Sequence, residues 1–246
     1  DNTFYDNERG VNIDRSNKTE ILNNMISNTG DTGIDISDSD KSIIQNNEIT
    51  KIKGYGIYLY SSDDNIVKRN TISHSQYGEL PTWEANGSAV CLDESDNNIV
   101  SSNLATNNNW GVFIGGAKNN RIEDNTIKSS EYSGMKVSGE YQNNIINNSI
   151  STSDESGIML EHAFNLEIVD NRIFRNDEEA IQILNSENNA ITNNNIQNNN
   201  QGISLENADN NVLSKNVLND NGNGISITDS HHSVITENQL SKNKYG

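Results

Sequence analysis

The sequence predicts a right-handed parallel β-helix, an all-β solenoid of ten coils that each hold about 22 or 23 residues. Two repeating patterns and one absence predict it. Apolar strand patterns and a single asparagine recur along the whole chain, and no window sustains the apolar stripe of an amphipathic helix. Parallel strands joined by crossovers wind right-handed, which sets the hand of the coil.

The apolar pattern marks the first strand of every coil. Its leading residues form one column, and a second apolar column follows two positions later. Side chains two apart on a strand share a face, so both columns point inward. A third apolar column lies ten residues after the first, from Ile21 to Ile235, and predicts a second strand. The first column is Val11, Ile34, Ile57, Val90, Val112, Met135, Ile158, Ile181, Ile203 and Ile225.

The recurring asparagine predicts an internal amide ladder. Coils stack at the strand-pairing distance of about 4.8 Å, so each asparagine meets its equivalent in the next coil. Asparagine also tolerates left-handed backbone, and we expect the ladder residues to form the bend themselves. A glycine before most first strands predicts a corner with torsions suited to glycine. The ladder residues are Asn24, Asn47, Asn70, Asn103, Asn125, Asn148, Asn171, Asn194, Asn216 and Asn238.

Composition narrows the partners. The net charge of −18 argues against nucleic acid, because phosphates are bound by Lys and Arg. The sequence contains no run of 18 apolar residues, so we expect no membrane insertion. Asn2-Thr3-Phe4 matches the closing step of a coil, and Tyr245-Gly246 matches the start of another. We therefore expect residues 1–246 to be one domain from a longer parent chain, extracellular or at the cell surface.

The repeat Gly-Ile-x-Leu, followed about ten residues later by Asn-x-Ile, resembles carbohydrate-binding and sugar-hydrolase β-helix repeats. These include NosD-like proteins and, more distantly, pectate-lyase-like enzymes. The resemblance covers the whole chain and implies the fold rather than one activity. NosD-like proteins are linked to copper-site maturation, but one cysteine and three methionines offer few soft copper ligands. The Asp-Pro-His signature of alginate epimerases is missing.

In such folds the ligand groove follows the outward residues of the first strand. Coils three to seven carry aromatic, acidic and basic residues at these positions. About ten extra residues, within an insertion at 73–86, precede the first strand of coil four and should overhang Asp93. The candidate catalytic residues are Asp93, Glu161, Lys136 and His162. The candidate substrate-binding residues are Tyr58, Tyr60, Phe113, Trp83, Trp110, Glu84 and His74.

Geometry limits the chemistry of these candidates. Asp93 and Glu161 lie three coils apart, about 14 Å at the strand spacing, which is too far for a paired-carboxylate glycosidase. We expect the insertion to supply a closer partner for Asp93, either Glu79 or Glu84. A lyase would instead use Lys136 to neutralise a uronate carboxylate, although Lys136 and Glu161 are equally open to being a surface ion pair. The aromatic residues on these strands have a simpler alternative explanation, the high propensity of aromatic side chains for β-strands.

No cofactor is expected, although turn-borne acids such as Asp38 and Asp40 leave Ca²⁺ open. The leading hypothesis is a domain that degrades a cell-envelope or extracellular polysaccharide, with uronate or amino-sugar units, as a glycoside hydrolase or polysaccharide lyase. The alternative is a non-catalytic carbohydrate-binding or structural surface module. The two separate on whether titratable side chains converge beside the insertion.

Overall fold

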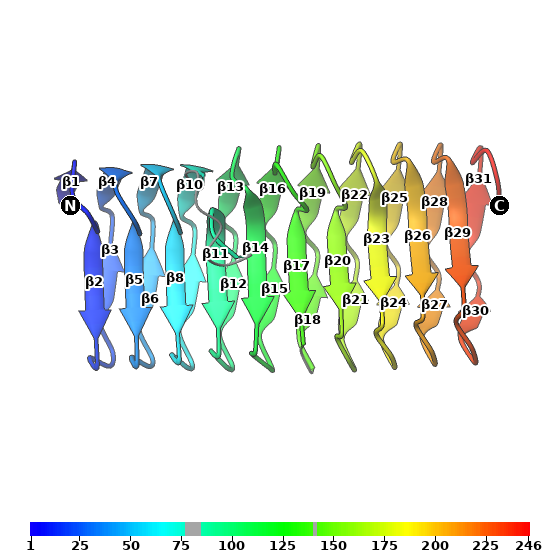
Figure 1. Ribbon diagram of the computed structural model, residues 1–246, viewed down its shortest axis with the longest axis horizontal. Helices are drawn as coiled ribbons and strands as arrows, with labels where there is room; N and C mark the ends of the chain where they lie inside the picture. Colours follow the sequence, from blue (N-terminus) through cyan, green and yellow to red (C-terminus); the bar gives the residue numbers. More distant parts are fainter. Residues whose placement is uncertain (77–84, 140–141) are drawn as a thin grey trace.

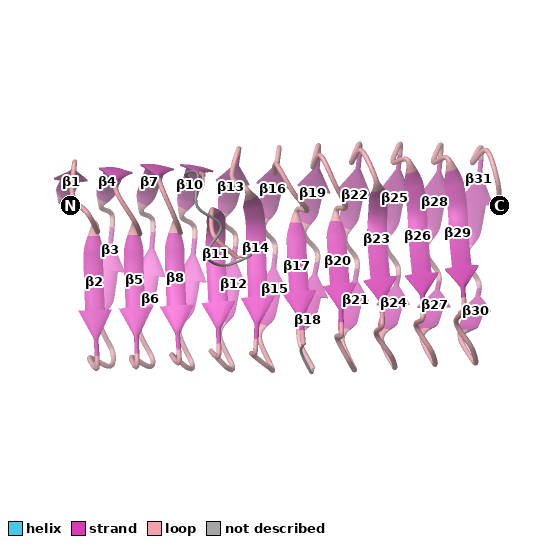
Figure 2. Ribbon diagram, viewed as in Figure 1, coloured by secondary structure: helices cyan, strands magenta, loops and turns pink. Residues whose placement is uncertain are grey.

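The computed structural model describes residues 1–76, 85–139 and 142–246. In this part of the chain three parallel sheets run side by side along a rod, with the N-terminus at one end and the C-terminus at the other (Figure 1). Strands and loops make up all of the described residues, and no helix occurs among them (Figure 2). Successive strands of the chain pass from sheet to sheet, so one coil contributes one strand to each.

The strands are short and their lengths recur from coil to coil. Sheet A contains β1 (Thr3–Tyr5), β4 (Met25–Thr29), β7 (Glu48–Ile52), β10 (Thr71–Ser75), β13 (Leu104–Thr106), β16 (Thr126–Lys128), β19 (Ser149–Ser151), β22 (Arg172–Phe174), β25 (Asn195–Gln197), β28 (Val217–Asn219) and β31 (Gln239–Ser241). Sheet B contains β2 (Val11–Asp14), β5 (Ile34–Ser37), β8 (Ile57–Tyr60), β11 (Ser88–Asp93), β14 (Trp110–Gly115), β17 (Met135–Ser138), β20 (Ile158–Glu161), β23 (Glu179–Leu184), β26 (Gln201–Glu206) and β29 (Asn223–Thr228). Sheet C contains β3 (Glu20–Leu22), β6 (Ile43–Gln45), β9 (Ile66–Lys68), β12 (Ile99–Ser101), β15 (Arg121–Glu123), β18 (Asn144–Ile146), β21 (Glu167–Val169), β24 (Ala190–Thr192), β27 (Val212–Ser214) and β30 (Val234–Thr236).

The predicted register of the coils is confirmed. Ile34 pairs with Ile57, and Ile57 pairs with Val90. The longer interval between Ile57 and Val90 does not shift this pairing, because the extra residues fall in the sequence between β10 and β11 and not within a paired strand. The sequence columns are therefore straight columns in space, and the parallel β-helix prediction is correct.

The apolar columns form one continuous core along the axis. Ile34, Ile36 and Ile122 are each 0% exposed. Burial fails in the C-terminal coil, where Ile227 is 41% and Ile235 46% exposed. In the inner coils, each apolar residue is covered by the equivalent residues of the coil before and the coil after.

The predicted asparagine ladder is confirmed, and each member is bonded several ways. The Asn125 side chain donates to the Asn148 Oδ1 at 3.0 Å and to the Val100 carbonyl at 2.8 Å. Its Oδ1 accepts from the backbone N–H of Asn103 at 2.9 Å. The expectation that ladder residues bend the backbone is wrong. The left-handed residue is the one before the ladder position, for example Asp124 with φ 56°.

Two further asparagine ladders were missed in the sequence. One precedes sheet C and the other follows sheet A. The ladder that follows sheet A contains Asn176, Asn199 and Asn221, whose side-chain amides are linked by hydrogen bonds of 3.0 Å. The first ladder runs through Asn65, Asn98, Asn120 and Asn143, and resumes at Asn189 and Asn211. Both were visible as recurrences at the coil period, though with serine or leucine substituted in some coils.

The glycines before sheet B are explained by contact rather than by torsion, which corrects the expectation. They are absent from the positive-φ glycines, which are Gly87, Gly116 and Gly139. A Cβ built on Gly111 would lie 2.4 Å from the Gly134 carbonyl oxygen. Close approach of neighbouring coils therefore selects glycine at this corner.

Candidate functional site

The outward side chains of sheet B lie in two straight lines, as the register predicts. Cys91, Phe113 and Lys136 follow Tyr58 in one line. The second line, two residues further along each strand, is Tyr60, Asp93, Gly115, Ser138 and Glu161. We call these residues, together with Met159, the sheet-B row.

The middle of the row is closed, which corrects the expectation of an open groove. The exposed fractions are 0% for Cys91, 4% for Asp93 and 2% for Lys136. A second, smaller apolar cluster covers this outer face and explains the burial. It consists of Tyr55, Ala85, Cys91, Trp110 and Phe113, with Tyr58 packed against it.

The cluster brings in aromatic residues that the sequence did not single out. Tyr55 stacks on Tyr58 with ring centroids 4.5 Å apart. Trp110 lies edge-on to Phe113 at 5.9 Å and beside Tyr132 at 5.0 Å. Trp110 and Phe113 are each 4% exposed, so their faces are packed against protein rather than open to a sugar ring. The signal for Tyr55 was its place directly before the corner glycine.

Among the described residues of this region, two aromatic rings remain open to solvent. Tyr60 is 39% and Tyr132 38% exposed. Tyr60 lies 6.3 Å from Tyr58, with the ring planes nearly parallel. These two tyrosines are the surfaces on which a sugar face can stack.

Asp93 is a buried carboxyl with one strong donor. The Tyr58 hydroxyl donates to its Oδ2 at 2.7 Å. Burial raises the pKa of Asp93 above its ordinary value, the hydrogen bond from Tyr58 opposes this, and the nearby Glu94 adds to it. Burial also raises the pKa of the Tyr58 phenol, so Tyr58 remains a donor. Asp93 therefore suits proton donation better than an exposed aspartate does.

Lys136 and Glu161 form an ion pair at the other end of the row. Lys136 Nζ lies 2.8 Å from Glu161 Oε2, with side-chain exposures of 3% and 32%. The hydrogen bond from Lys136 lowers the pKa of Glu161, and burial partly opposes it. Glu161 thus stays ionised, and Lys136 already has a carboxylate partner. His162 follows in the turn and is exposed, with φ 53°.

Between Asp93 and Glu161 the second line carries two small residues, Gly115 and Ser138. The space beside Gly115 is filled by Phe113, because a Cβ built on Gly115 would lie 3.1 Å from a ring carbon of Phe113. The first line therefore covers these small residues, and the two carboxyls stand at opposite ends of the closed part of the row.

Asp93→Asn is expected to raise the free energy of unfolding at neutral pH by about 1 kcal/mol. The carboxylate is costly to bury, whereas an amide is neutral and still accepts from Tyr58. Because the folded-state pKa of Asp93 is raised, the gain should shrink as the pH falls through that pKa and the carboxyl becomes neutral. Urea unfolding at neutral and acidic pH measures it. Tyr58→Phe should instead lose stability, and a loss in both variants would contradict this account.

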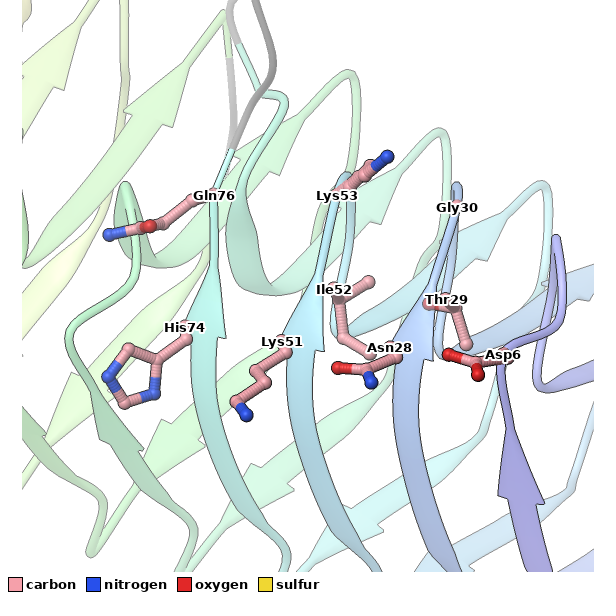
Figure 3. A pocket seen from close by; sticks show the side chains of 9 residues that line it. All are labelled: Asp6, Asn28, Thr29, Gly30, Lys51, Ile52, Lys53, His74 and Gln76. Carbon is pink, nitrogen blue, oxygen red and sulfur yellow. The ribbon is translucent and has the colours of Figure 1, made fainter.

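The remaining predicted residues fall elsewhere. His74 lies on β10 in sheet A, where it lines a pocket with Lys51 and Lys53, so the structure does not bring it into the row (Figure 3). Trp83 and Glu84 lie outside the described residues. The described part of the insertion resumes at Ala85, which belongs to the outer cluster together with Cys91.

The turn-borne acids have a structural role. Asp40 Oδ1 accepts from the Asp63 backbone N–H at 2.9 Å, and Asp63 in turn accepts from Asp96 at 2.7 Å. Within the described ranges, no three His, Cys, Asp or Glu side chains gather as a metal site would require. In the same ranges, no helix is long and apolar enough to cross a bilayer.

A family model described as a right handed beta helix region matches residues 88–244. The chain belongs to this family. The match agrees with the predicted hand of the coil, and a second model, described as periplasmic copper-binding protein (NosD), matches residues 1–87 of this β-helix. Both agree with the resemblance seen in the repeat. No curated protein matches the β-helix in sequence.

Solved structures share the fold at low identity. The A-module of the mannuronan C-5 epimerase AlgE4 of Azotobacter vinelandii superposes with a TM-score of 0.69 at 13% identity, covering 99% of this β-helix and 87% of that chain. PfbA, a surface adhesin of Streptococcus pneumoniae, gives 0.72 at 15% identity, covering 95% and 71%. The Dettilon tailspike protein gives 0.71 at 15% identity, covering 92% and 54%. These likenesses establish the fold alone.

Proposed function

We propose that this chain is a polysaccharide-degrading domain, secreted or at the cell surface, that cleaves a glycan lying across the sheet-B row. The carrying observation is the buried carboxyl of Asp93, which accepts a hydrogen bond from Tyr58 beside the exposed ring of Tyr60 and whose pKa is raised by burial. A carboxyl with a raised pKa next to a surface on which a sugar can stack is typical of a general acid. An epimerase acting on mannuronan and a tailspike protein among the similar structures support a glycan as the substrate.

In this proposal Asp93 is the general acid. Protonation of the departing glycosidic oxygen is a step that glycoside hydrolases and polysaccharide lyases share. The raised pKa of Asp93 and its fixed hydrogen bond to Tyr58 suit that step. Tyr60, exposed beside it, supports a sugar ring.

Glu161 lies three coils from Asp93, about 14 Å at the strand spacing, so it cannot act as the base at the bond that Asp93 protonates. In this proposal Glu161 and His162 instead contact the polymer further along the row. Because Lys136 is buried and paired with Glu161, it keeps that carboxylate ionised rather than binding a substrate carboxylate.

A second candidate is a carbohydrate-binding module without catalysis. It is favoured by the spacing of about 14 Å that three coils impose between Asp93 and Glu161, beyond the range of paired glycosidase carboxyls. The open tyrosines Tyr60 and Tyr132 would serve binding equally well.

Incubation with a panel of acidic and amino-sugar polysaccharides tests the proposal. New reducing ends report cleavage, and absorbance of unsaturated uronates distinguishes a lyase from a hydrolase. We expect Asp93→Asn to lower turnover at least about hundredfold, and Glu161→Gln to weaken binding of the polymer and so raise KM. Glu206→Gln is the matched control, because Glu206 lies in the Glu161 column two coils further along and is exposed.

Three results are decisive. Cleavage that Asp93→Asn retains in full removes Asp93 from the proposed role, and an unchanged KM in Glu161→Gln does the same for Glu161. Binding of a glycan without any product supports the module instead. An equal rise of KM in Glu206→Gln would attribute the Glu161 effect to charge rather than to position.

A further inference from the structure

A pocket of about 600 Å³ lies at the ends of the first sheet-A strands, away from the sheet-B row. Three successive strands, β4, β7 and β10, contribute Asn28, Lys51 and His74 to its lining (Figure 3). Lys53 and Gln76, which also line it, follow Lys51 and His74 by two residues. We call this pocket the sheet-A trough. Because sheets A and B are different faces of the rod, a ligand here would not occupy the row.

The trough gathers positive charge on an acidic protein. The chain carries 35 acidic against 17 basic residues, yet Lys51, Lys53 and His74 line this one pocket. Asp6 is the acidic residue in its lining. In the described ranges none of the three basic side chains has an ion pair or hydrogen-bond partner, whereas Arg9, for example, is paired with two aspartates. The two ammonium charges and the imidazole N–H are therefore available to an anion.

The register places two of these groups side by side. Ser73 pairs with Thr50 and Ser75 with Ile52, so His74 lies beside Lys51 one coil away, at about the 4.8 Å strand spacing. Figure 3 shows both side chains extending from the same side of their strands, while Lys53 extends the other way and stands at the rim. Two adjacent donors of this kind fit the two oxygens of a carboxylate.

The trough continues along the rod as a polar surface whose two charged residues are acidic. Gln76 lines both it and a neighbouring hollow. That hollow is lined by amides and hydroxyls, with Asn107, Asn108, Ser129 and Ser130 among them, and by Glu131 and Asp154. Groups of this kind donate to and accept from sugar hydroxyls. The pair of hollows is therefore long enough for more than one sugar unit.

We propose that the sheet-A trough is a second glycan site, which holds a carboxylate-bearing sugar at Lys51 and His74, with the charge of Lys53 nearby, while the rest of the oligosaccharide lies over the polar hollow. The preference for an anion stands on the three basic side chains. The choice of a sugar as its carrier rests on the proposed function. The site would hold the polymer on one face of the rod while the row acts on another part of it.

Two of the four histidines make the test local. His74 lies in the trough and His162 at the end of the row. Their imidazole signals, assigned with His74→Gln and His162→Gln, are followed by NMR while an oligogalacturonate with free carboxylates is added. The same oligomer as its methyl ester tests the need for charge. We expect a saturable shift of the His74 signal with the acid and little shift with the ester.

Lys51→Gln combined with Lys53→Gln should weaken the response of His74 about tenfold, because charged hydrogen bonds to the carboxylate are lost. The response of His162 should be unchanged. Lys18→Gln combined with Lys242→Gln is the matched control, since both lysines are exposed, have positive φ and lie near the two ends of the rod. It removes the same charge and should leave the His74 response intact.

Equal weakening in both double variants would overturn the proposal, because the attraction would then be diffuse. So would a His74 response to inorganic phosphate as strong as that to the oligosaccharide, which would indicate an anion site without sugar recognition. The titration involves no turnover, so its failure is distinct from a failure of the proposed cleavage. An inactive Asp93→Asn variant should still show the His74 shift.

Discussion

Asn125→Ala is expected to lower the free energy of unfolding by about 3–5 kcal/mol, more than truncation of a polar side chain normally costs. The substitution takes the acceptor from the buried backbone N–H of Asn103 and the donor from the Val100 carbonyl. It also removes the hydrogen bond from the Asn125 side-chain amide to Asn148 Oδ1. Each buried group left unsatisfied costs about 1–3 kcal/mol. Urea unfolding followed by circular dichroism measures the loss.

Asn195→Ala provides the control for composition. Asn195 is exposed on β25, and its change should stay within about 0.5 kcal/mol. Asn238→Ala, at the last coil, should cost less than Asn125→Ala because it is only partly buried. Similar losses at Asn125 and Asn195 would show that the ladder does not stabilise the fold.

Glu161→Gln is expected to destabilise the protein by about 2–3 kcal/mol, because it leaves the ammonium of Lys136, 3% exposed, without its carboxylate. Lys136→Met should cost less, since Glu161 is 32% exposed and water can solvate it. The double substitution should resemble Lys136→Met, because an apolar side chain needs no partner. The same unfolding measurement compares all three variants.

The pH dependence gives a second readout of this pair. The folded-state pKa of Glu161 is lowered, so its contribution is present above the ordinary value of 4.5 and is lost as the pH falls through the folded pKa. The stability gap between the wild-type protein and Glu161→Gln should therefore close in acid. A gap that persists there, or a larger loss in Lys136→Met, would contradict the assignment of the buried charge.

The coil geometry could be predicted from the sequence because each position of the repeat requires the same kind of residue in every coil. An inward residue such as Ile34 must be apolar in every coil, and its equivalents recur at the coil period. The same reasoning placed Asp93, Gly115 and Glu161 on one line, which the register confirms. Repetition turns a one-dimensional spacing into a column.

Burial on the outer face could not be predicted in the same way. Tyr55 and Trp110 share the position before the corner glycine, but polar residues fill that position in the other coils. No column therefore indicates that these two residues, with Ala85, cover Cys91 and close the row. Likewise, the left-handed residue before each ladder position varies among Asn, Asp, Arg, Ser, Lys and Glu, and its identity carries little signal. Local features that a single coil owns are visible only in three dimensions.

Because each coil is held by the two beside it, the rod does not loosen uniformly. Ile235, in the last described coil, is 46% exposed, whereas its equivalent Ile122, which has a coil on either side, is 0% exposed. Peeling an outer turn away therefore breaks one set of contacts, whereas opening an inner turn breaks two. Amide protons should exchange fastest near the termini and slowest midway, where Asp93 and Glu161 are held in place for the longest time.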